Sequence, residues 1–245
     1  MEAGRTPGWA AGYAERLVEW IREQVARAGA AGTVVASSGG VDSAVTAGLC
    51  QRAFPGAALA LFLPCHSDPQ DGECARIVAE ALGLEQKTIV LDGAYDALVS
   101  ALGASAWSRL ALGNLKVRLR TIVAYAHANQ MNRLVVGTSN RSEITVGYFT
   151  KYGDGACDIA PLGRLVKREV RELARELGVP ERVVERVPSA GLWPGQTDEG
   201  ELGLTYAELD AYLRGEVVRP EVAARIESLR RASEHKRRPP AVPDF

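Results

Sequence analysis

The chain has 245 residues, of which 47% are hydrophobic and 24% are charged, and its formal net charge is −1. This composition excludes a disordered chain and fits one globular α/β domain. The near-zero net charge gives no general attraction to nucleic acid, and no window reaches the roughly 18 consecutive apolar residues that a membrane span needs. Because the N-terminus "MEAGRTPGWA" also lacks the plan of a signal peptide, we expect a cytoplasmic protein that binds neither nucleic acid nor membranes.

Four apolar runs rich in β-branched residues alternate with helix-like segments. The runs are "TVVAS" (33–37), "AALALFLP" (57–64), "QKTIVL" (86–91) and "RLVVGT" (133–138). Strands and helices in this order predict a parallel sheet with right-handed crossovers and helices on both faces. The predicted fold class is therefore α/β, with a Rossmann-like sheet.

A long helix is predicted from Ala106 to Gln130, a stretch without proline. Apolar side chains recur along it at three- and four-residue spacing, which predicts one packed face. That face comprises Leu115, Leu119, Ile122 and Ala126. Further apolar side chains extend beyond this stripe, namely Leu110, Leu112, Val117 and Val123. Surplus apolar surface of this kind suits a second chain, so we expect two copies to pair through this helix.

The turn after the first strand, "SSGGVDS" (37–43), carries the clearest functional signal. Beyond the carboxyl end of a parallel strand, the free N–H groups of the following helix bind anions. The two glycines allow the backbone to approach phosphate oxygens, and Ser38 and Ser43 add hydroxyl donors. Asp42 would repel a bare phosphate, a conflict that a Mg²⁺ ion held by Asp42 resolves. The alternative is a Ser/Gly turn that only caps a helix.

The second half of the chain contains two irregular segments rich in glycine, "VGYFTKYGDGACD" and "PSAGLWPGQTDEGELG". Long irregular segments within a compact domain are typical of functional loops. Amphipathic helices that end at glycine are predicted near them, at residues 165–178 and 206–215.

The word "SGGVDS" resembles the pyrophosphate-binding loop of enzymes that cleave ATP between its α and β phosphates. Longer blocks resemble NAD synthetase in the same order, among them "LVVGTSNRSEITVGYFTKYGDGACDIAPL", "LVKREV" and "EHKRRPP". The resemblance implies an adenine nucleotide alpha hydrolase-like fold, with residues 1–245 forming one NAD synthetase domain and no glutaminase domain. It also implies a homodimer whose dinucleotide site lies near the interface.

The same resemblance implies the residues that bind ATP and Mg²⁺. The ATP set comprises Ser37, Ser38, Gly39, Gly40, Val41, Asp42, Ser43, Thr138, Lys167 and Ser189. The Mg²⁺ ligands would be Asp42 and Glu143, because a hard cation beside polyphosphate favours carboxylate oxygens. Lys167 would supply the mobile positive charge that the lysine-free turn lacks. As an alternative, Glu143 is a solvated helix residue.

For the dinucleotide substrate, the resemblance implies Arg118, Lys151, Asp158, His235 and Lys236. Basic side chains suit a substrate that carries a pyrophosphate and a carboxylate. Two alternatives stay open: Arg118 could merely cover the flank of the long helix, and the basic C-terminal tail could simply be solvated.

The implied reaction has two steps and takes ammonia as the nitrogen donor. The carboxylate of nicotinic acid adenine dinucleotide (deamido-NAD) attacks ATP, releasing pyrophosphate, and ammonia then displaces AMP from the acyl adenylate. We expect Lys167 to stabilise the leaving pyrophosphate, Asp154 to bind and deprotonate ammonium, and Lys151 to steady the intermediate. The rival interpretations are another ATP-pyrophosphatase ligase or thiolase, and a nucleotide-binding module without catalysis.

Overall fold

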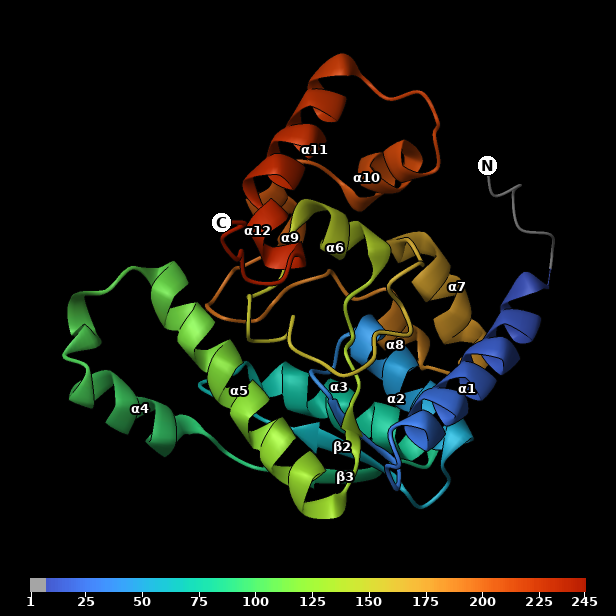
Figure 1. The fold of residues 1–245 in the computed structure, drawn as a ribbon. Coiled ribbons are helices and arrows are strands. Elements are labelled where there is room, and N and C mark those ends of the chain that lie inside the picture. The colour runs from blue at the N-terminus through green and yellow to red at the C-terminus, as the bar shows by residue number, and fades with distance from the viewer. Residues whose placement is uncertain (1–7) are drawn as a thin grey trace.

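The computed structural model describes residues 8–245, and within them the sheet has four parallel strands in the order β3-β2-β1-β4 (Figure 1). The strands are β1 (Thr33–Ala36), β2 (Ala58–Phe62), β3 (Glu85–Thr88) and β4 (Leu134–Val135). The first, second and fourth predicted runs contain β1, β2 and β4, and the third overlaps β3, which begins one residue earlier and ends at Thr88. The predicted parallel α/β sheet is therefore confirmed. Central strand β1 pairs on both sides, with Thr33 opposite Ala58 and Leu134. A parallel bridge between Val136 and Ile159 continues the sheet beyond β4.

Helices cover both faces of this sheet. They are α1 (Trp9–Arg27), α2 (Val41–Ala53), α3 (Pro69–Leu82), α4 (Asp92–Ala101), the short 3₁₀ helix η1 (Ala104–Ala106), α5 (Arg109–Met131), α6 (Arg141–Val146), α7 (Lys167–Leu177), α8 (Glu181–Val184), α9 (Asp198–Leu202), α10 (Tyr206–Leu213), α11 (Pro220–Ala232) and α12 (Glu234–Arg237). Successive strand side chains point to opposite faces, so Val35 packs in the core with α1, α2 and α7 while Val34 packs in the core with α5. No helix in residues 8–245 is both long and apolar enough to cross a membrane.

The C-terminal helices form a third, smaller core. It joins α6 to α9, α10 and α11 through Val146, Leu202, Leu209 and Ile226. In Figure 1, α10 and α11 project above the sheet layer. The predicted helices at 165–178 and 206–215 correspond to α7 and α10.

Helix α5 differs from its prediction in both start and packed face. It begins at Arg109 rather than Ala106, because the Ser108 side chain accepts a hydrogen bond from Ala111 N at 3.2 Å and caps the helix. The expected packed stripe is only half right, because Leu115 and Leu119 pack against the core whereas Ile122 is 64% exposed and Ala126 is also exposed. The side chains that pack inward are mostly small, and the buried positions are Gly113, Lys116, Val117, Ala124 and Ala128.

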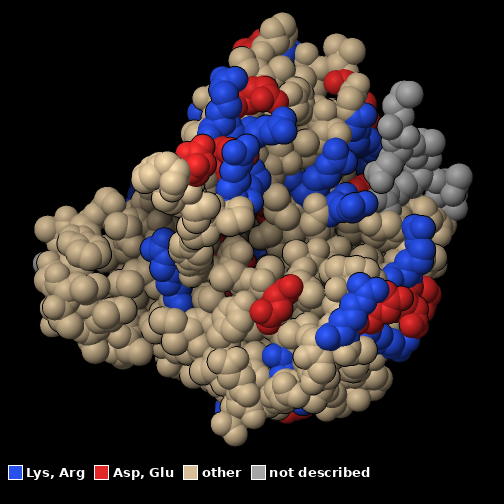
Figure 2. All heavy atoms as spheres, viewed as in Figure 1, with Lys and Arg blue, Asp and Glu red and all other residues tan. Residues whose placement is uncertain are grey.

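The outer side of α5 and the neighbouring helix α4 therefore carry apolar surface. Leu110 is 60% exposed, and Leu102 and Trp107 are each 46% exposed. Figure 2 shows few charged side chains over this arm of the molecule, which α4 and the first half of α5 form in Figure 1. Val117 and Val123, which we expected on the surplus surface, instead pack in the chain's own core: Val117 is buried and Val123 is half-buried against the core beneath α5.

The turn between β1 and α2 requires glycine at position 39. Gly39 has φ +79°, a left-handed conformation that side chains disfavour. A Cβ atom added there would lie 2.5 Å from the carbonyl oxygen of Asp71 in α3 and 3.0 Å from Cys74 Cβ. The turn thus lies directly against the first turns of α3.

We predict that Gly39→Ala lowers the free energy of unfolding by about 2 kcal/mol or more, because it adds both backbone strain and overlap with a fixed carbonyl. The matched control is Gly40→Ala, since Gly40 has φ −92° and an added Cβ would meet only Ser38 Oγ, at 3.3 Å. Thermal and urea unfolding measure both variants. Equal losses in the two variants would contradict the special role of position 39.

Candidate active site

A cavity of about 250 Å³ lies at the carboxyl ends of the strands. Its wall includes residues 36–38 and 40–43 from the end of β1 onward, 61–63 at the end of β2 and 135–139 from the end of β4 onward. In an open parallel sheet this edge is where ligands bind.

The turn at the start of α2 is held by its own serine hydroxyls. Ser43 Oγ accepts a hydrogen bond from Ser38 N at 3.1 Å and donates to Gly40 O at 2.9 Å, and the two hydroxyl oxygens lie 3.1 Å apart. These hydrogen bonds hold the turn in place without using all of the first backbone N–H groups of α2 as donors. Such a helix start, with the positive end of the helix dipole behind it, can bind an anion.

Lys167 is the first residue of α7, and its side chain is buried against two carboxylates. No other basic side chain in residues 8–245 combines these two features. Lys167 Nζ pairs closely with Asp42 Oδ2 and lies 3.2 Å from Glu143 Oε1. A lysine at a helix start opposes the helix dipole, and its side chain is only 3% exposed. Burial lowers the pKa of Lys167, but the charges of Asp42 and Glu143 outweigh this effect and raise it above its ordinary value.

The carboxylates are in turn oriented by Asn140. Its Nδ2 donates to Asp42 Oδ1 at 2.7 Å, and its side chain forms a capping box with Glu143 at the start of α6. Burial first, and the negative charge of Asp42 second, raise the pKa of Glu143 to about 8, although Lys167 opposes the shift. Glu143 is therefore not the solvated helix residue of the alternative interpretation.

A further carboxylate, Asp198, was not assigned from the sequence. Tyr206 Oη donates to Asp198 Oδ2 at 2.9 Å and lies 3.3 Å from Glu143 Oε1, while Lys167 Nζ lies 4.8 Å from the centre of the Tyr206 ring. Burial raises the pKa of Asp198, and its Oδ1 is buried without a hydrogen-bond partner. Three carboxyl groups thus lie near one lysine, and a bound cation would stabilise their ionised forms.

Among residues 8–245, no three His, Cys, Asp or Glu side chains are grouped so that they could hold a metal ion by themselves. Asp42 and Glu143 can nevertheless supply two oxygen ligands, since both reach the same Lys167 ammonium group. That donor set matches Mg²⁺, which proteins usually bind through one or two carboxylates together with phosphate and water oxygens.

Most of the remaining ATP-set residues also line the cavity. Of the residues assigned to ATP, metal and ammonium from the sequence, those on the wall are Ser37, Ser38, Gly40, Val41, Asp42, Ser43, Thr138, Glu143, Asp154, Lys167 and Ser189. Gly39 is not on the wall, because it faces α3 instead. Asp154 Oδ1 accepts a hydrogen bond from Thr150 N at 2.7 Å, and desolvation by the surrounding wall raises the pKa of this carboxyl.

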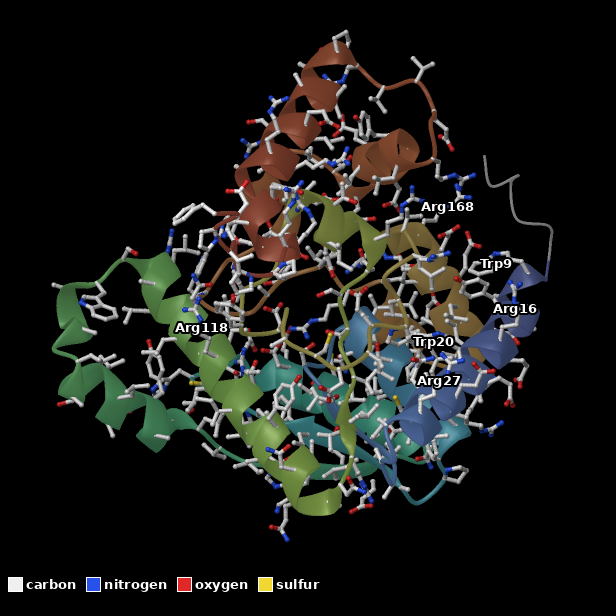
Figure 3. All side chains as sticks on the ribbon, viewed as in Figure 1. Trp9, Arg16, Trp20, Arg27, Arg118 and Arg168 are labelled. Carbon is white, nitrogen blue, oxygen red and sulfur yellow. The ribbon has the colours of Figure 1, made fainter. Side chains whose placement is uncertain are left out.

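The residues assigned to the dinucleotide lie outside the cavity wall. Arg118 projects from α5 (Figure 3), and its Nη2 donates to Lys151 O at 3.2 Å. Lys151 Nζ donates to His235 O at 2.5 Å, and Lys236 Nζ donates to Phe149 O at 2.8 Å. Four of these residues therefore form one cluster between α5, the 147–158 loop and α12.

The fifth residue of the set, Asp158, lies apart from this cluster at the sheet edge. Its Oδ2 accepts a hydrogen bond from Val135 N at 2.7 Å, and its Oδ1 accepts one from Tyr125 Oη at 3.2 Å. Asp158 thus connects the 147–158 loop to β4 and α5.

The loop that carries Ser189 is docked on α5. Lys116 Nζ donates to Leu192 O at 3.1 Å, and the ring of Trp193 lies over Gly113, where an added Cβ would be 3.1 Å from it. The Arg109 guanidinium lies 5.0 Å from the centre of the same ring. These contacts explain why the inner side of α5 carries a glycine and a buried lysine.

Comparison with known proteins identifies the family of the chain. Residues 13–240 match the NAD synthase family. An NH(3)-dependent NAD(+) synthetase from Carboxydothermus hydrogenoformans is 48% identical over 94% of this chain and 96% of its own length. Among solved structures, the NMN synthetase from Francisella tularensis has a TM-score of 0.92 and 41% identity, over 96% of this chain and 99% of its own. The NH3-dependent NAD synthetase from Campylobacter jejuni has a TM-score of 0.81 and 29% identity, with the same coverage. The chain therefore belongs to the NAD synthase family.

Proposed function

We propose that this chain joins ammonia to the carboxylate of deamido-NAD, with ATP as the energy source, and forms NAD, AMP and pyrophosphate. The observation that carries the proposal is the convergence of Asp42, Glu143 and Lys167 beside the "SGGVDS" turn in one cavity. A carboxylate pair with a buried lysine at an anion-binding helix start suits polyphosphate chemistry. Family membership supplies the acceptor and the nitrogen donor.

ATP would lie across the carboxyl ends of β1, β2 and β4. The start of α2 would bind its outer phosphates through backbone N–H groups, and Lys167 would contribute a positive charge beside them. Thr138 and Ser189 lie on the same wall and offer hydroxyl groups to the nucleotide.

Asp42 and Glu143 would hold Mg²⁺ together with phosphate oxygens and water. When bound, the ion neutralises phosphate charge and stabilises the leaving pyrophosphate. Asn140 positions both carboxylates, through its bond to Asp42 and its capping box with Glu143.

The second substrate would bind between α5, the 147–158 loop and α12. Arg118, Lys151, Asp158, His235 and Lys236 are our candidates for its contacts, and three of them are fixed cations. Its carboxylate would reach the cavity wall near Asp154, and attack at the ATP α-phosphorus would give the acyl adenylate.

Asp154 is our candidate for binding ammonium and accepting its proton. Desolvation raises the pKa of this carboxyl above its ordinary value, which makes it a stronger base than an exposed aspartate. Lys151 would steady the intermediate from the loop beside it.

A second candidate function is the amidation of nicotinic acid mononucleotide, and the observation that favours it is the high similarity to an NMN synthetase structure. The two reactions share the ATP half of the site and the ammonia step. They differ in the acid substrate, because only deamido-NAD carries an adenylate portion that would bind to the basic cluster outside the cavity.

The test is a set of turnover assays with ATP, Mg²⁺ and ammonium, using each acid substrate in turn and measuring AMP, pyrophosphate and the amide product. We expect kcat/KM for deamido-NAD to exceed that for the mononucleotide by about tenfold or more, since its adenylate portion adds one phosphate that can accept a charge-assisted hydrogen bond. Glutamine should not replace ammonium. A preference for the mononucleotide would select the second candidate, and AMP release without either amide would reject both.

Asp42→Asn should lower turnover by about 100-fold or more while leaving the fold intact, because it removes half of the anionic metal ligation.

We also predict a pH-dependent stability effect at Glu143. A carboxyl with a raised pKa destabilises the fold as pH increases, because the unfolded chain releases the proton near pH 4.5 and the folded chain keeps it to about pH 8. In EDTA, Glu143→Gln should match the wild-type Tm near pH 4.5 and exceed it progressively toward pH 8. In a separate assay with Mg²⁺ and without EDTA, the variant should lose the Mg²⁺-dependent activity of the wild type. Glu80→Gln on the exposed surface of α3 is the control. A Tm difference that is constant or falls with pH would contradict the prediction.

We further propose that two copies of the chain pair through the outer side of α5 and the adjoining α4 arm. The argument is the exposed apolar surface there, at Leu102, Trp107, Leu110 and Ile122, together with the scarcity of charge over the same arm (Figure 2). A two-fold pair would bury this surface against itself. The basic cluster at Arg118 would then lie close to the interface.

Ile122→Glu should convert the dimer to a monomer and raise the KM for the dinucleotide, while ATP binding persists. Ile122 is a cleaner position than Val123, because Val123 packs in the chain's own core. Val217→Glu is the control, since Val217 is 100% exposed and lies between α10 and α11. Light scattering at micromolar concentration measures the assembly, and a wild-type chain that is monomeric and fully active would show the proposal to be wrong.

A further inference from the structure

Three basic side chains line the cavity, and one of them, Arg120, has no carboxylate partner. Lys167 is paired with two carboxylates, and Arg186 is paired with Asp71 at 2.6 Å. Within residues 8–245, no carboxylate oxygen lies at ion-pair distance from the Arg120 guanidinium. Arg120 is thus the one cation on the described wall that has no carboxylate at ion-pair distance.

The guanidinium of Arg120 is held in place by neutral groups. Its Nε donates to Leu63 O at 3.0 Å, and its Nη2 donates to Ser67 Oγ at 3.1 Å, both in the segment after β2. These bonds fix the side chain while using only part of its five N–H donors. The remaining donors are free to bind a ligand.

Helix geometry separates Arg120 from its neighbour Arg118. Two residues apart on an α-helix correspond to a rotation of about 200°, so the two side chains leave opposite sides of α5. Arg118 reaches Lys151 O outside the cavity wall, whereas Arg120 is on the wall itself. The two arginines therefore meet different parts of the substrates.

A cation that is withdrawn from water without a counter-ion is unfavourable. Burial lowers the pKa of Arg120, with smaller opposing effects from Cys65, Asp71 and Asp154, yet a guanidinium remains charged at physiological pH. An anionic group of a ligand in the cavity would offset this cost.

The position of Arg120 on the cavity wall determines which anionic group of a ligand it can contact. The start of α2 and Lys167 lie together on one part of the wall and suit the outer phosphates that leave as pyrophosphate. Arg120 lies on another part, beside residues 61–63 at the end of β2 and influenced by Asp154. The anion that stays between the nucleoside and the acyl group throughout the proposed reaction is the α-phosphate.

We propose that Arg120 binds the α-phosphate of ATP and stays bound to the same phosphate in the acyl adenylate; this inference rests on the proposed function. In the first step the substrate carboxylate oxygen forms a bond to the α-phosphorus, and the bond from that phosphorus to the oxygen bridging it to the β-phosphorus breaks. The bonding electrons leave with pyrophosphate, and Arg120 keeps its proton. Negative charge on the α-phosphate oxygens is then balanced by a fixed cation at the reacting centre.

The first test uses AMP and adenosine, which differ only by the α-phosphate, in calorimetric binding to the full chain. Wild type should bind AMP more tightly than adenosine. Arg120→Gln should weaken AMP binding by about tenfold or more and leave adenosine binding within about twofold, since a charge-assisted hydrogen bond is lost. Arg120→Lys should keep part of the preference for AMP. Unchanged adenosine binding also reports that the variant is folded.

Ser67→Ala is the matched control, because it removes one bond that holds the guanidinium without removing its charge. We expect Ser67→Ala to keep most of the preference for AMP over adenosine. In a separate assay, Arg120→Gln should slow pyrophosphate exchange into ATP by about tenfold or more. Equal losses for AMP and adenosine, or equal effects of Ser67→Ala and Arg120→Gln, would show that Arg120 only braces the segment after β2 and would overturn the proposal. The binding comparison needs no amide product, so its result stands apart from the test of the ligase reaction.

Discussion

The ion pairs of Lys167 with Asp42 and Glu143 hold the site together, because they join three helices that are far apart in the sequence. Each charged group lies in the first turn of its helix: Asp42 in α2, Glu143 in α6 and Lys167 in α7. Asp198 likewise begins α9. The positive ends of these helix dipoles therefore meet at the cavity, which helps to stabilise an excess of carboxylates there and favours incoming phosphate.

This convergence explains which parts of the site a sequence can reveal. The strand, the glycine turn and the start of α2 are contiguous, so "SGGVDS" predicts both its structure and its anion site. Glu143 stands three residues after Asn140, the spacing of a capping box, and that signal could also have placed Asn140 beside the carboxylates. Lys167 gives no such signal, because a lysine at the start of an amphipathic helix reads as a solvated residue. Its role came only from the family resemblance.

The errors on α5 have a different cause. Hydrophobic periodicity assumes that the packed side of a helix carries its large apolar residues. Here the inner side meets both the sheet and the loop that carries Trp193, and this close approach requires Gly113 and admits the long stem of Lys116. The larger apolar side chains, such as Ile122, are consequently displaced to the outer side. Arg120 was not predicted for a related reason, since its partners Leu63 and Ser67 lie 57 and 53 residues earlier in the chain. Asp198 bonds to nearby Tyr206, and it is this tyrosine that connects it to Glu143, 55 residues before Asp198 in the chain.

Helix α5 connects the three parts of the proposed enzyme. Arg118 and Ile122 are four residues apart and share one side of the helix, so the dinucleotide cluster and the proposed interface are adjacent. Arg120 leaves the opposite side and lies on the cavity wall. A disturbance of the interface would therefore reach the dinucleotide contacts directly, whereas it would reach the α-phosphate position only by moving the whole helix. Because α5 is fastened by Lys116 to the Ser189 loop and by Arg120 to the segment after β2, such a movement would have to break several hydrogen bonds at once. A disturbance of the interface should therefore affect the ATP half of the site less than the dinucleotide cluster.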